Sequence, residues 1–424
     1  MKNSSTTKAV ASNTFYQLLA KILTMSITVL ATIIITRVYG KESFGEFNLM
    51  QAYPALFFVI VDFGFNAIAT KELSTNWDKA EKYLSNILGI RILFSVILIA
   101  LIGFVIHFFP YSSNLKFGIY LSLFLILTQA LYATTNIIFQ VKLRYDYSSI
   151  GLLLGYVVIL FAILVLSYLR VNVVWVNFSY VVGGLVTFIV NFYYVRKFDV
   201  RIKLAFDKEI WQPLVLQALP IGLMFVFSQI NFKADSILLS VLSLPEGYGL
   251  SNTESVAVYG LPYKVFEVSL VVPTFFMNAV YPIYVMHLGE SKTRFKETIK
   301  KSLLALGVAG LVFGILGVIL SPLAILILGG SEFTESILVL RLLLGGLVLF
   351  YLSQPISWII VTLGKQKYLP LIYLIGSVVN LTLNFIFIPR YSFYASSVIT
   401  WISEFLILIM LSFAAYKAWH KYNA

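Results

Sequence analysis

The stretch Ser228-Gln-Ile-Asn-Phe-Lys233-Ala-Asp235-Ser-Ile-Leu-Leu239 places two ionisable side chains inside an apolar segment long enough to cross a membrane. A charged side chain at the centre of a bilayer costs at least about 2.5–3.5 kcal/mol on insertion scales, so such residues face protein or a water-filled cavity rather than lipid. Lys233 and Asp235 are two positions apart, about 200° around a helix, and cannot easily pair with each other. We therefore expect a multi-span transporter whose substrate path these charges help to line.

The composition of the whole chain favours a membrane protein. Of its 424 residues, 59% are hydrophobic and only 12% are charged, and the mean hydropathy is +0.89. A soluble domain of this size cannot bury so much apolar surface. Apolar runs of about 18–25 residues, enough to cross a ~30 Å hydrocarbon core, recur along the sequence. The predicted fold class is an all-α polytopic membrane protein with about twelve transmembrane helices.

The formal charge of +12 does not indicate nucleic-acid binding, because the Lys and Arg residues fall in short loops between apolar runs. That distribution is the one that sets membrane orientation. The chain has no cysteine and three scattered histidines, so it offers neither a thiolate nor a histidine metal site.

No phosphate-binding loop is visible in the sequence. Gly40-Lys41 and Gly364-Lys365 both lack the upstream Gly and the following Ser or Thr of such a loop. The chain therefore carries no visible ATPase, and for a transporter we expect neither enzyme activity nor a cofactor. A gradient, the supply of substrate or a partner protein would drive transport, and the coupling ion would be H⁺ or Na⁺.

The basic linker from Arg196 to Lys208 divides the chain near its middle, and we expect lobes at residues 1–204 and 205–424. A signal peptide is a competing interpretation of the N-terminus, but the apolar run from Ile22 to Ile35 has no small-residue cleavage site. The predicted spans lie at about 13–36, 48–70, 84–109, 117–140, 148–169 and 173–195, and then at about 213–241, 255–286, 301–328, 335–363, 368–388 and 393–416.

The loop cations predict the orientation of these spans. With the N-terminus inside, 21 Lys and Arg residues fall in cytoplasmic segments and 5 in outer segments. This bias places both termini in the cytoplasm. Orientation alone accounts for nearly all of these loop cations, with binding of anionic lipid headgroups as a secondary alternative.

Two pairs of similar segments indicate an internal repeat. Glu42-Ser-Phe-Gly-Glu-Phe47 resembles Glu254-Ser-Val-Ala-Val-Tyr259 at an offset of 212 residues, and Lys142-Leu-Arg-Tyr145 resembles Lys365-Gln-Lys-Tyr368 at an offset of 223. Two matches in the same order favour a duplication of six spans. An even number of spans per half gives both halves the same orientation, so a pseudo-twofold axis would run along the membrane normal, with the substrate site between the lobes.

Several segments together carry a resemblance to a known family: Arg37–Phe47, Asp62-Phe-Gly64, the span with Lys233 and Asp235, Glu254–Lys264, and a closing motif made of Asn380–Ser392 and Ser403-Glu404. They resemble the polysaccharide-transporter branch of the multidrug/oligosaccharidyl-lipid/polysaccharide flippase superfamily, whose members include flippases for O-antigen and other lipid-linked oligosaccharides. In the closing motif, Ala395-Ser-Ser397 stands where Gly-Ala-Ala is common.

The resemblance implies twelve helices in two lobes around a central, often cationic, cavity. It also implies translocation of undecaprenyl-diphosphate-linked O-antigen or similar oligosaccharide units across the bacterial cytoplasmic (inner) membrane. The implied partners are the lipid bilayer, this lipid-linked substrate, and a polysaccharide polymerase with its chain-length regulator.

Five cations fall within predicted spans and are the candidates for binding the diphosphate. These cations would lower the energy barrier that the hydrocarbon core presents to the charged diphosphate. Each cation also has an alternative role. Lys21 and Lys233 could form buried ion pairs, Arg91 and Arg341 could snorkel to the end of a span, and Lys264 could pair with Glu267. The candidate substrate-binding residues are Lys21, Arg91, Lys233, Lys264 and Arg341.

Four acids in or near spans are candidates for a coupling site or for counter-ions: Asp62, Asp235, Glu267 and Glu404. A structural counter-ion for Lys21 or Lys264 is the alternative for Asp235. Asp62 could instead cap the backbone next to Gly64.

Two other function classes compete with the flippase. The first is a cation-coupled multidrug antiporter of the same superfamily, but such proteins favour an acidic site, and the first span here offers Lys21 and no acid. The second is a membrane-embedded glycan ligase or polymerase. The sequence argues against it because the predicted outer side has no long loop to hold such an active site.

Overall fold

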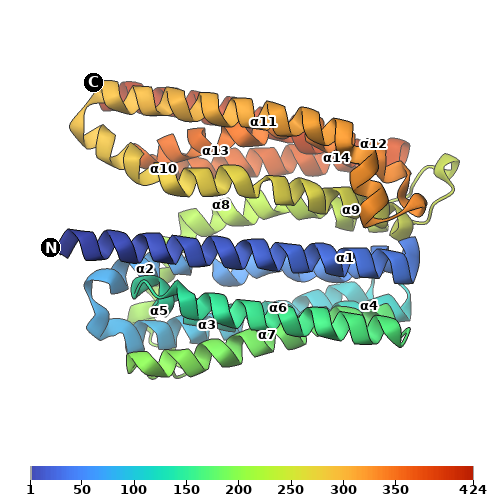
Figure 1. Ribbon diagram of the computed structural model, residues 1–424, viewed down its shortest axis with the longest axis horizontal. Helices are drawn as coiled ribbons and strands as arrows, with labels where there is room; N and C mark the ends of the chain where they lie inside the picture. The colour runs from blue at the N-terminus through green and yellow to red at the C-terminus, as the bar shows by residue number, and fades with distance from the viewer. Residues whose placement is uncertain (1, 424) are drawn as a thin grey trace. The chain divides into compact units, whose positions relative to one another are not determined.

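The structure is a computed structural model that describes the backbone of residues 2–423 and the side chains of residues 15–422. Every regular element in this part of the chain is a helix (Figure 1). Ten helical segments of the described chain are long and apolar enough to cross a membrane. Two of them, Phe15–Thr75 and Gln366–Tyr422, have 61 and 57 residues and are each divided by a non-helical residue, Gly40 or Ser392. Ten segments therefore give twelve crossings, and the predicted all-α fold is confirmed.

The chain folds into two compact units, Met1–Gly222 and Leu223–Ala424. The first six crossings belong to unit 1. Its helices are α1 (Lys2–Asp62), α2 (Phe65–Thr75), α3 (Ala80–His107), α4 (Ser113–Ser122), α5 (Phe124–Val141), α6 (Tyr145–Tyr168) and α7 (Val173–Val195), with short 3₁₀ turns at Trp77–Lys79 and Arg196–Phe198.

Unit 2 holds the last six crossings and begins within α8. Its helices are α8 (Lys208–Val241), α9 (Asn252–Ser269), α10 (Val271–Glu290), α11 (Lys292–Leu328), α12 (Glu335–Gly345), α13 (Leu347–Thr362) and α14 (Leu369–Asn423), with 3₁₀ turns at Glu246–Tyr248, Ser331–Phe333 and Gln366–Tyr368.

The basic linker packs against unit 1. The Lys203 N–H donates to Ser85 Oγ at 3.1 Å, and the Asp207 N–H donates to Asn86 Oδ1 at 2.6 Å. Val200 lies in the same buried cluster as residues of α3 and of the first half of α8. The boundary between compact units falls later, at Gly222/Leu223. The lobe boundary after residue 204 rests on chain composition and stays a prediction.

A backbone reversal at the end of α1 positions one candidate site residue, Asp62. Phe63 and Gly64 have φ of 40° and 77°, values that an ordinary helical residue cannot adopt. A Cβ at Gly64 would lie 3.0 Å from the Ile221 side chain, so glycine also allows the close approach of α8. Asp62 is therefore the last residue of α1 and projects from a fixed helix end within the second crossing.

Glycines bring neighbouring helices of each unit together. In unit 1, α6 lies alongside α7 (Figure 1), and a Cβ at Gly155 would lie 2.5 Å from the Gly183 carbonyl oxygen. In unit 2, a Cβ at Gly310 would lie 2.9 Å from Val348 Cα, and one at Gly314 would lie 3.0 Å from the Leu344 oxygen. Close packing at small residues is a common way for membrane helices to associate, and the glycines of α11 allow it here.

Candidate functional site

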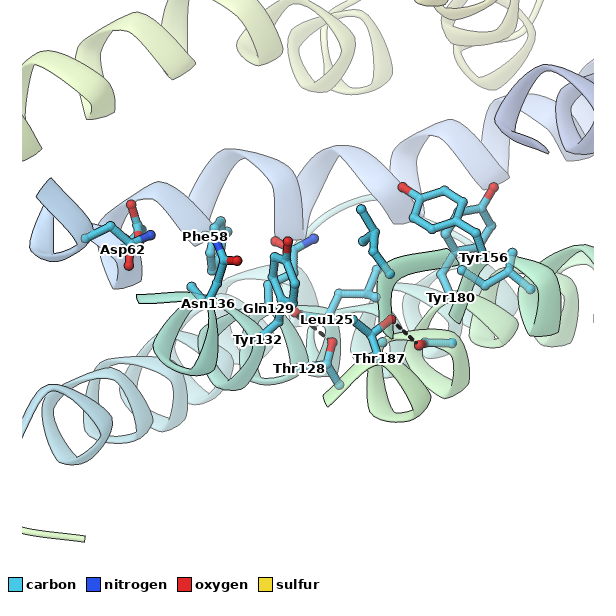
Figure 2. A pocket seen from close by; sticks show the side chains of 16 residues that line it. Phe58, Asp62, Leu125, Thr128, Gln129, Tyr132, Asn136, Tyr156, Tyr180 and Thr187 are labelled. Atoms are coloured by element: carbon cyan, nitrogen blue, oxygen red, sulfur yellow. Dashed lines mark hydrogen bonds between the residues drawn. The ribbon is translucent and has the colours of Figure 1, made fainter. Parts of the chain in front are cut away.

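A pocket of about 330 Å³ opens inside unit 1 (Figure 2). Its walls come from the second half of α1, the start of α2, and from α5, α6 and α7. The lining residues are Phe58, Asp62, Asn66, Leu125, Thr128, Gln129, Tyr132, Ala133, Asn136, Leu152, Tyr156, Ile159, Tyr180, Gly183, Gly184 and Thr187.

The pocket surface is mostly apolar, with scattered polar groups and almost no charge. Among the lining residues, Asp62 is the one acidic residue, and none is Lys or Arg. Phenols, carboxamides and threonines supply the other polar groups. Tyr132 and Asn136 share the hydroxyl of Ser148, with oxygen–oxygen distances of 3.3 Å and 2.6 Å. The pocket thus offers many hydrogen-bonding groups and little net charge.

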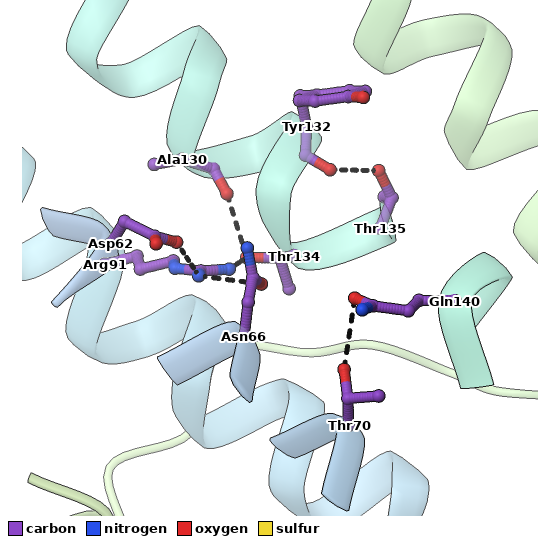
Figure 3. Close-up of polar contacts among 9 residues, drawn as sticks. All are labelled: Asp62, Asn66, Thr70, Arg91, Ala130, Tyr132, Thr134, Thr135 and Gln140. Carbon is purple, nitrogen blue, oxygen red and sulfur yellow. Dashed lines mark hydrogen bonds and ion pairs between the residues drawn. The ribbon is translucent and has the colours of Figure 1, made fainter. Parts of the chain in front are cut away.

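A buried ion pair lies behind one wall of this pocket (Figure 3). Arg91 of α3 has no exposed surface, and its Nη2 donates to Asp62 Oδ1 at 2.6 Å and to Asn66 Oδ1 at 3.1 Å. Its Nη1 donates to Thr134 Oγ1 at 3.0 Å. Neither of the two expectations for Arg91, cavity lining or snorkelling, describes this side chain, because it is sealed among three helices. Asp62 pairs with Arg91 and does not act as a local backbone cap.

Lys21, the other candidate cation of unit 1, lies on the first crossing with an exposed side chain. It is outside the pocket. Lys21 therefore does not form the buried ion pair that was its alternative role. The role of Lys21 in substrate binding stays a prediction.

In unit 2, three of the candidate residues come together between α8 and α9. Lys233 Nζ forms an ion pair with Glu267 Oε1, and the two side chains are 21% and 38% exposed. The Lys233 ammonium also lies 5.5 Å from the centre of the Tyr263 ring. Lys264 is half-buried on α9 and interacts electrostatically with both members of the pair. Glu267 thus forms its ion pair with Lys233, across helices.

Asp235 lies two residues from Lys233 but in a separate, fully buried network. Its carboxylate accepts hydrogen bonds from Tyr259 Oη at 2.7 Å, Asn384 Nδ2 at 3.0 Å and Thr400 Oγ1 at 3.2 Å. Ser396 Oγ in turn donates to Asn384 Oδ1 at 2.9 Å. Neutral donors of α9 and α14 therefore hold this carboxylate, and the expected structural pairing with Lys21 or Lys264 is not needed to explain its burial.

Of the last two candidates of unit 2, Glu404 interacts electrostatically with Tyr263, the ring next to Lys233, whereas Arg341 lies elsewhere. Glu404 of α14 is 5% exposed. Arg341 of α12 is exposed, and its Nε donates to Ser321 Oγ at 3.1 Å and to the Val318 carbonyl at 3.3 Å. The guanidinium therefore links α12 to α11. The structure brings together the Arg91–Asp62 pair and the charges around Lys233, with Glu404 near the latter, and it leaves Lys21 and Arg341 outside both.

Sequence reasoning missed the neutral residues of the pocket. Gln129, Tyr132 and Asn136 follow one another at spacings of three and four residues and project to the same side of α5 (Figure 2). Such a polar stripe on an otherwise apolar span is the signal that could have found them. The stripe carries no charge, so the cost of burying a charge, which singles out the other candidates, does not reveal it.

Twelve crossings in two compact units, with polar groups held inside each unit, define a membrane transporter. A family profile described as "Polysaccharide biosynthesis protein" matches residues 10–288, and the chain belongs to this family. A second profile, described as MatE, matches residues 214–386. The resemblance to the polysaccharide branch of the flippase superfamily is thereby confirmed. No curated protein sequence matches the chain.

Solved structures share the fold at low identity. A lipid II flippase MurJ in an inward closed conformation is 15% identical, with 94% of this chain and 87% of that one covered and a TM-score of 0.75. An inward-facing multidrug resistance MATE family transporter of the MOP superfamily is 14% identical, with 95% and 96% covered and a TM-score of 0.74. A MOP superfamily transporter from Pyrococcus furiosus is 14% identical, with 98% and 95% covered and a TM-score of 0.66. The fold is that of MOP superfamily transporters.

Proposed function

We propose that this protein translocates an undecaprenyl-diphosphate-linked oligosaccharide, such as an O-antigen or related surface-polysaccharide repeat unit, across the bacterial cytoplasmic membrane by alternating access. The observation that carries the proposal is the match to the polysaccharide biosynthesis family over residues 10–288. The fold of MOP superfamily transporters supports a carrier mechanism, and the similarity to a lipid II flippase is consistent with a lipid-linked cargo.

We assign Lys233 and the neighbouring Lys264 to binding of the diphosphate. Lys233 lies eight residues, or about 12 Å of helix, before the end of α8. At such depth an ammonium group is costly unless it has a counter-charge or a hydrated space. It has one acidic partner in Glu267, whose partial exposure leaves the pair accessible to a ligand. With Lys264 beside it, a diphosphate could replace Glu267 as the counter-charge.

The network around Asp235 is our candidate for the coupling site. A carboxylate with no exposed surface and only neutral hydrogen-bond donors binds either a proton or a small cation such as Na⁺ at low cost, because either one removes an uncompensated buried charge. Since α8 carries both Asp235 and Lys233, the state of one site can be transmitted to the other through a single helix.

Loss of Lys233 is the sharpest test of the cationic site. In a deletion strain complemented with Lys233→Ala, we expect lipid-linked glycan to accumulate on the cytoplasmic side and surface polysaccharide to be lost. Lys233→Arg keeps the charge and should retain part of the export. Lys300→Ala, which removes an exposed cation of α11, is the matched control. Normal surface polysaccharide in Lys233→Ala cells, at equal protein levels, would exclude the assignment.

A multidrug antiporter is the second candidate, and the MatE profile over residues 214–386 favours it. Against it, the acid in the unit 1 pocket is already neutralised by Arg91 and offers little attraction to a cationic drug. Drug susceptibility of the deletion strain separates the two functions. Hypersensitivity to several cationic drugs with intact surface polysaccharide would favour the antiporter.

Orientation and partners belong to the same proposal. The excess of loop cations supports cytoplasmic termini, which cysteine-accessibility or reporter fusions at the C-terminus can test. A polysaccharide polymerase and a chain-length regulator would act on the translocated units. Co-purification from cells that make the polysaccharide tests whether they bind the flippase directly.

A further inference from the structure

We propose that the pocket of unit 1 binds a sugar ring of the transported glycan, and that the polar side chains of the pocket form hydrogen bonds with the uncharged hydroxyl groups of the sugar. This inference rests on the proposed function and adds a site that none of the charged candidates supplies. It assigns the saccharide to the neutral pocket and leaves the diphosphate to the cations of unit 2.

The charge of the pocket argues against a phosphate ligand. None of its lining residues is Lys or Arg. The nearest cation, Arg91, is fully buried and already bonded to Asp62, Asn66 and Thr134. A diphosphate placed here would lose its hydration and meet a carboxylate instead of a compensating positive charge. The same Arg91 compensates Asp62, so an organic cation also gains little.

The hydrogen-bonding groups suit a polyhydroxylated ligand. Among the described residues, the Gln129 amide has no hydrogen-bond partner, and the Asn136 side chain only accepts a bond, from Ser148. Amide groups that can both donate and accept match sugar hydroxyls, which also do both. Asp62 Oδ2 adds an acceptor, because the bond from Arg91 uses Oδ1. Asp62 comes from α1, and Gln129 and Asn136 come from α5 (Figure 2).

Aromatic side chains and glycines complete the fit. Tyr132, Tyr156 and Tyr180 combine a flat carbon face with a hydroxyl tip, which suits the C–H face and hydroxyl rim of a sugar. Gly184 keeps the wall open, since a Cβ there would already lie 2.6 Å from Thr128 Oγ1. The volume of about 330 Å³ is at the low end for small-molecule sites, so the pocket can hold only part of a lipid-linked glycan.

The absence of natural cysteine allows a direct test. Gln129→Cys introduces one thiol in the pocket. Gln140→Cys places one on the same helix at a residue that bonds Thr70 and does not line the pocket. The probe is the oligosaccharide released by mild acid from lipid-linked material of cells that lack the protein. We expect it to slow thiol modification of Gln129→Cys about tenfold when saturating, with no change for Gln140→Cys and no protection by inorganic pyrophosphate.

A second measurement keeps the inference testable if the cysteine variant does not insert. Gln129→Leu should weaken calorimetric binding of the same oligosaccharide by about tenfold, the loss of one or two hydrogen bonds, whereas Gln140→Leu should not. If lipid-linked material accumulates in the deletion strain but the oligosaccharide protects neither thiol and binds both leucine variants equally, the pocket assignment is wrong and the flippase stands. If no lipid-linked material accumulates, the proposed function fails, and this inference with it.

Discussion

Removing the carboxylate of Asp62 should destabilise unit 1 more than removing the guanidinium of Arg91. Asp62→Ala leaves a cation with no exposed surface and no counter-charge, which costs about 3–5 kcal/mol. Arg91→Met leaves a carboxylate that is 23% exposed and faces the pocket, where water can hydrate it, so we expect about 1–3 kcal/mol. The double variant removes both charges and should be more stable than Asp62→Ala alone.

Thermal unfolding in detergent measures this asymmetry. A change of 1 kcal/mol shifts the midpoint by about 2–4 °C in a unit of this size, so Asp62→Ala should lower it by about 10 °C. Asp78→Ala, which removes an exposed acid on the 3₁₀ turn before α3, is the control and should change it little. The reasoning is refuted if Arg91→Met is the less stable single variant, or if the double variant is less stable than both.

Three further changes test local geometry by the same measurement. Gly155→Ala should cost about 1–3 kcal/mol because its Cβ meets α7 backbone, whereas Gly103→Ala, with no atom within 3.9 Å, should be tolerated. Gly40→Ala should cost about 1–3 kcal/mol, since φ 76° and ψ −175° suit only glycine; an unchanged midpoint would contradict this. The hydrogen bond from Lys82 lowers the pKa of Asp207, so this contact adds stability above the unfolded pKa of about 3.9 and loses it as pH falls through the folded value. Asp207→Asn should therefore lower the midpoint at neutral pH and leave it unchanged in strong acid; an equal loss at both would count against the ion pair.

Hydropathy predicted the crossings well because the bilayer imposes one length and one composition on every span. The breaks were harder to place. The sequence predicts a loop at residues 37–47 between two spans, but the helix resumes directly after Gly40. At Ser392 a residue with φ of 49° separates two helices without any loop, and nothing in its side chain predicts that conformation.

The candidate site was predictable in its charges but not in their partners. The cost of burying Lys233, Arg91 and Asp235 is a local property that the sequence displays. Their contacts are not local, because Arg91 meets a residue 29 positions away and Asp235 meets Thr400, 165 positions away. Which of several acids meets which cation depends on helix rotation and packing, and hydropathy carries no information about either.

The hairpin turns at Gly40 and Ser392 leave almost no polypeptide outside the helices on their side of the membrane. Both follow an odd-numbered crossing, as does the segment at residues 242–251, so all three share that side. The other segments on this side, at residues 108–112, 169–172 and 329–334, are shorter than 242–251, so an antibody or nanobody would find its longest exposed segment at 242–251. Reagents for trapping the transporter or following it in cells are therefore best aimed at that segment, and an epitope tag inserted there would be the most accessible.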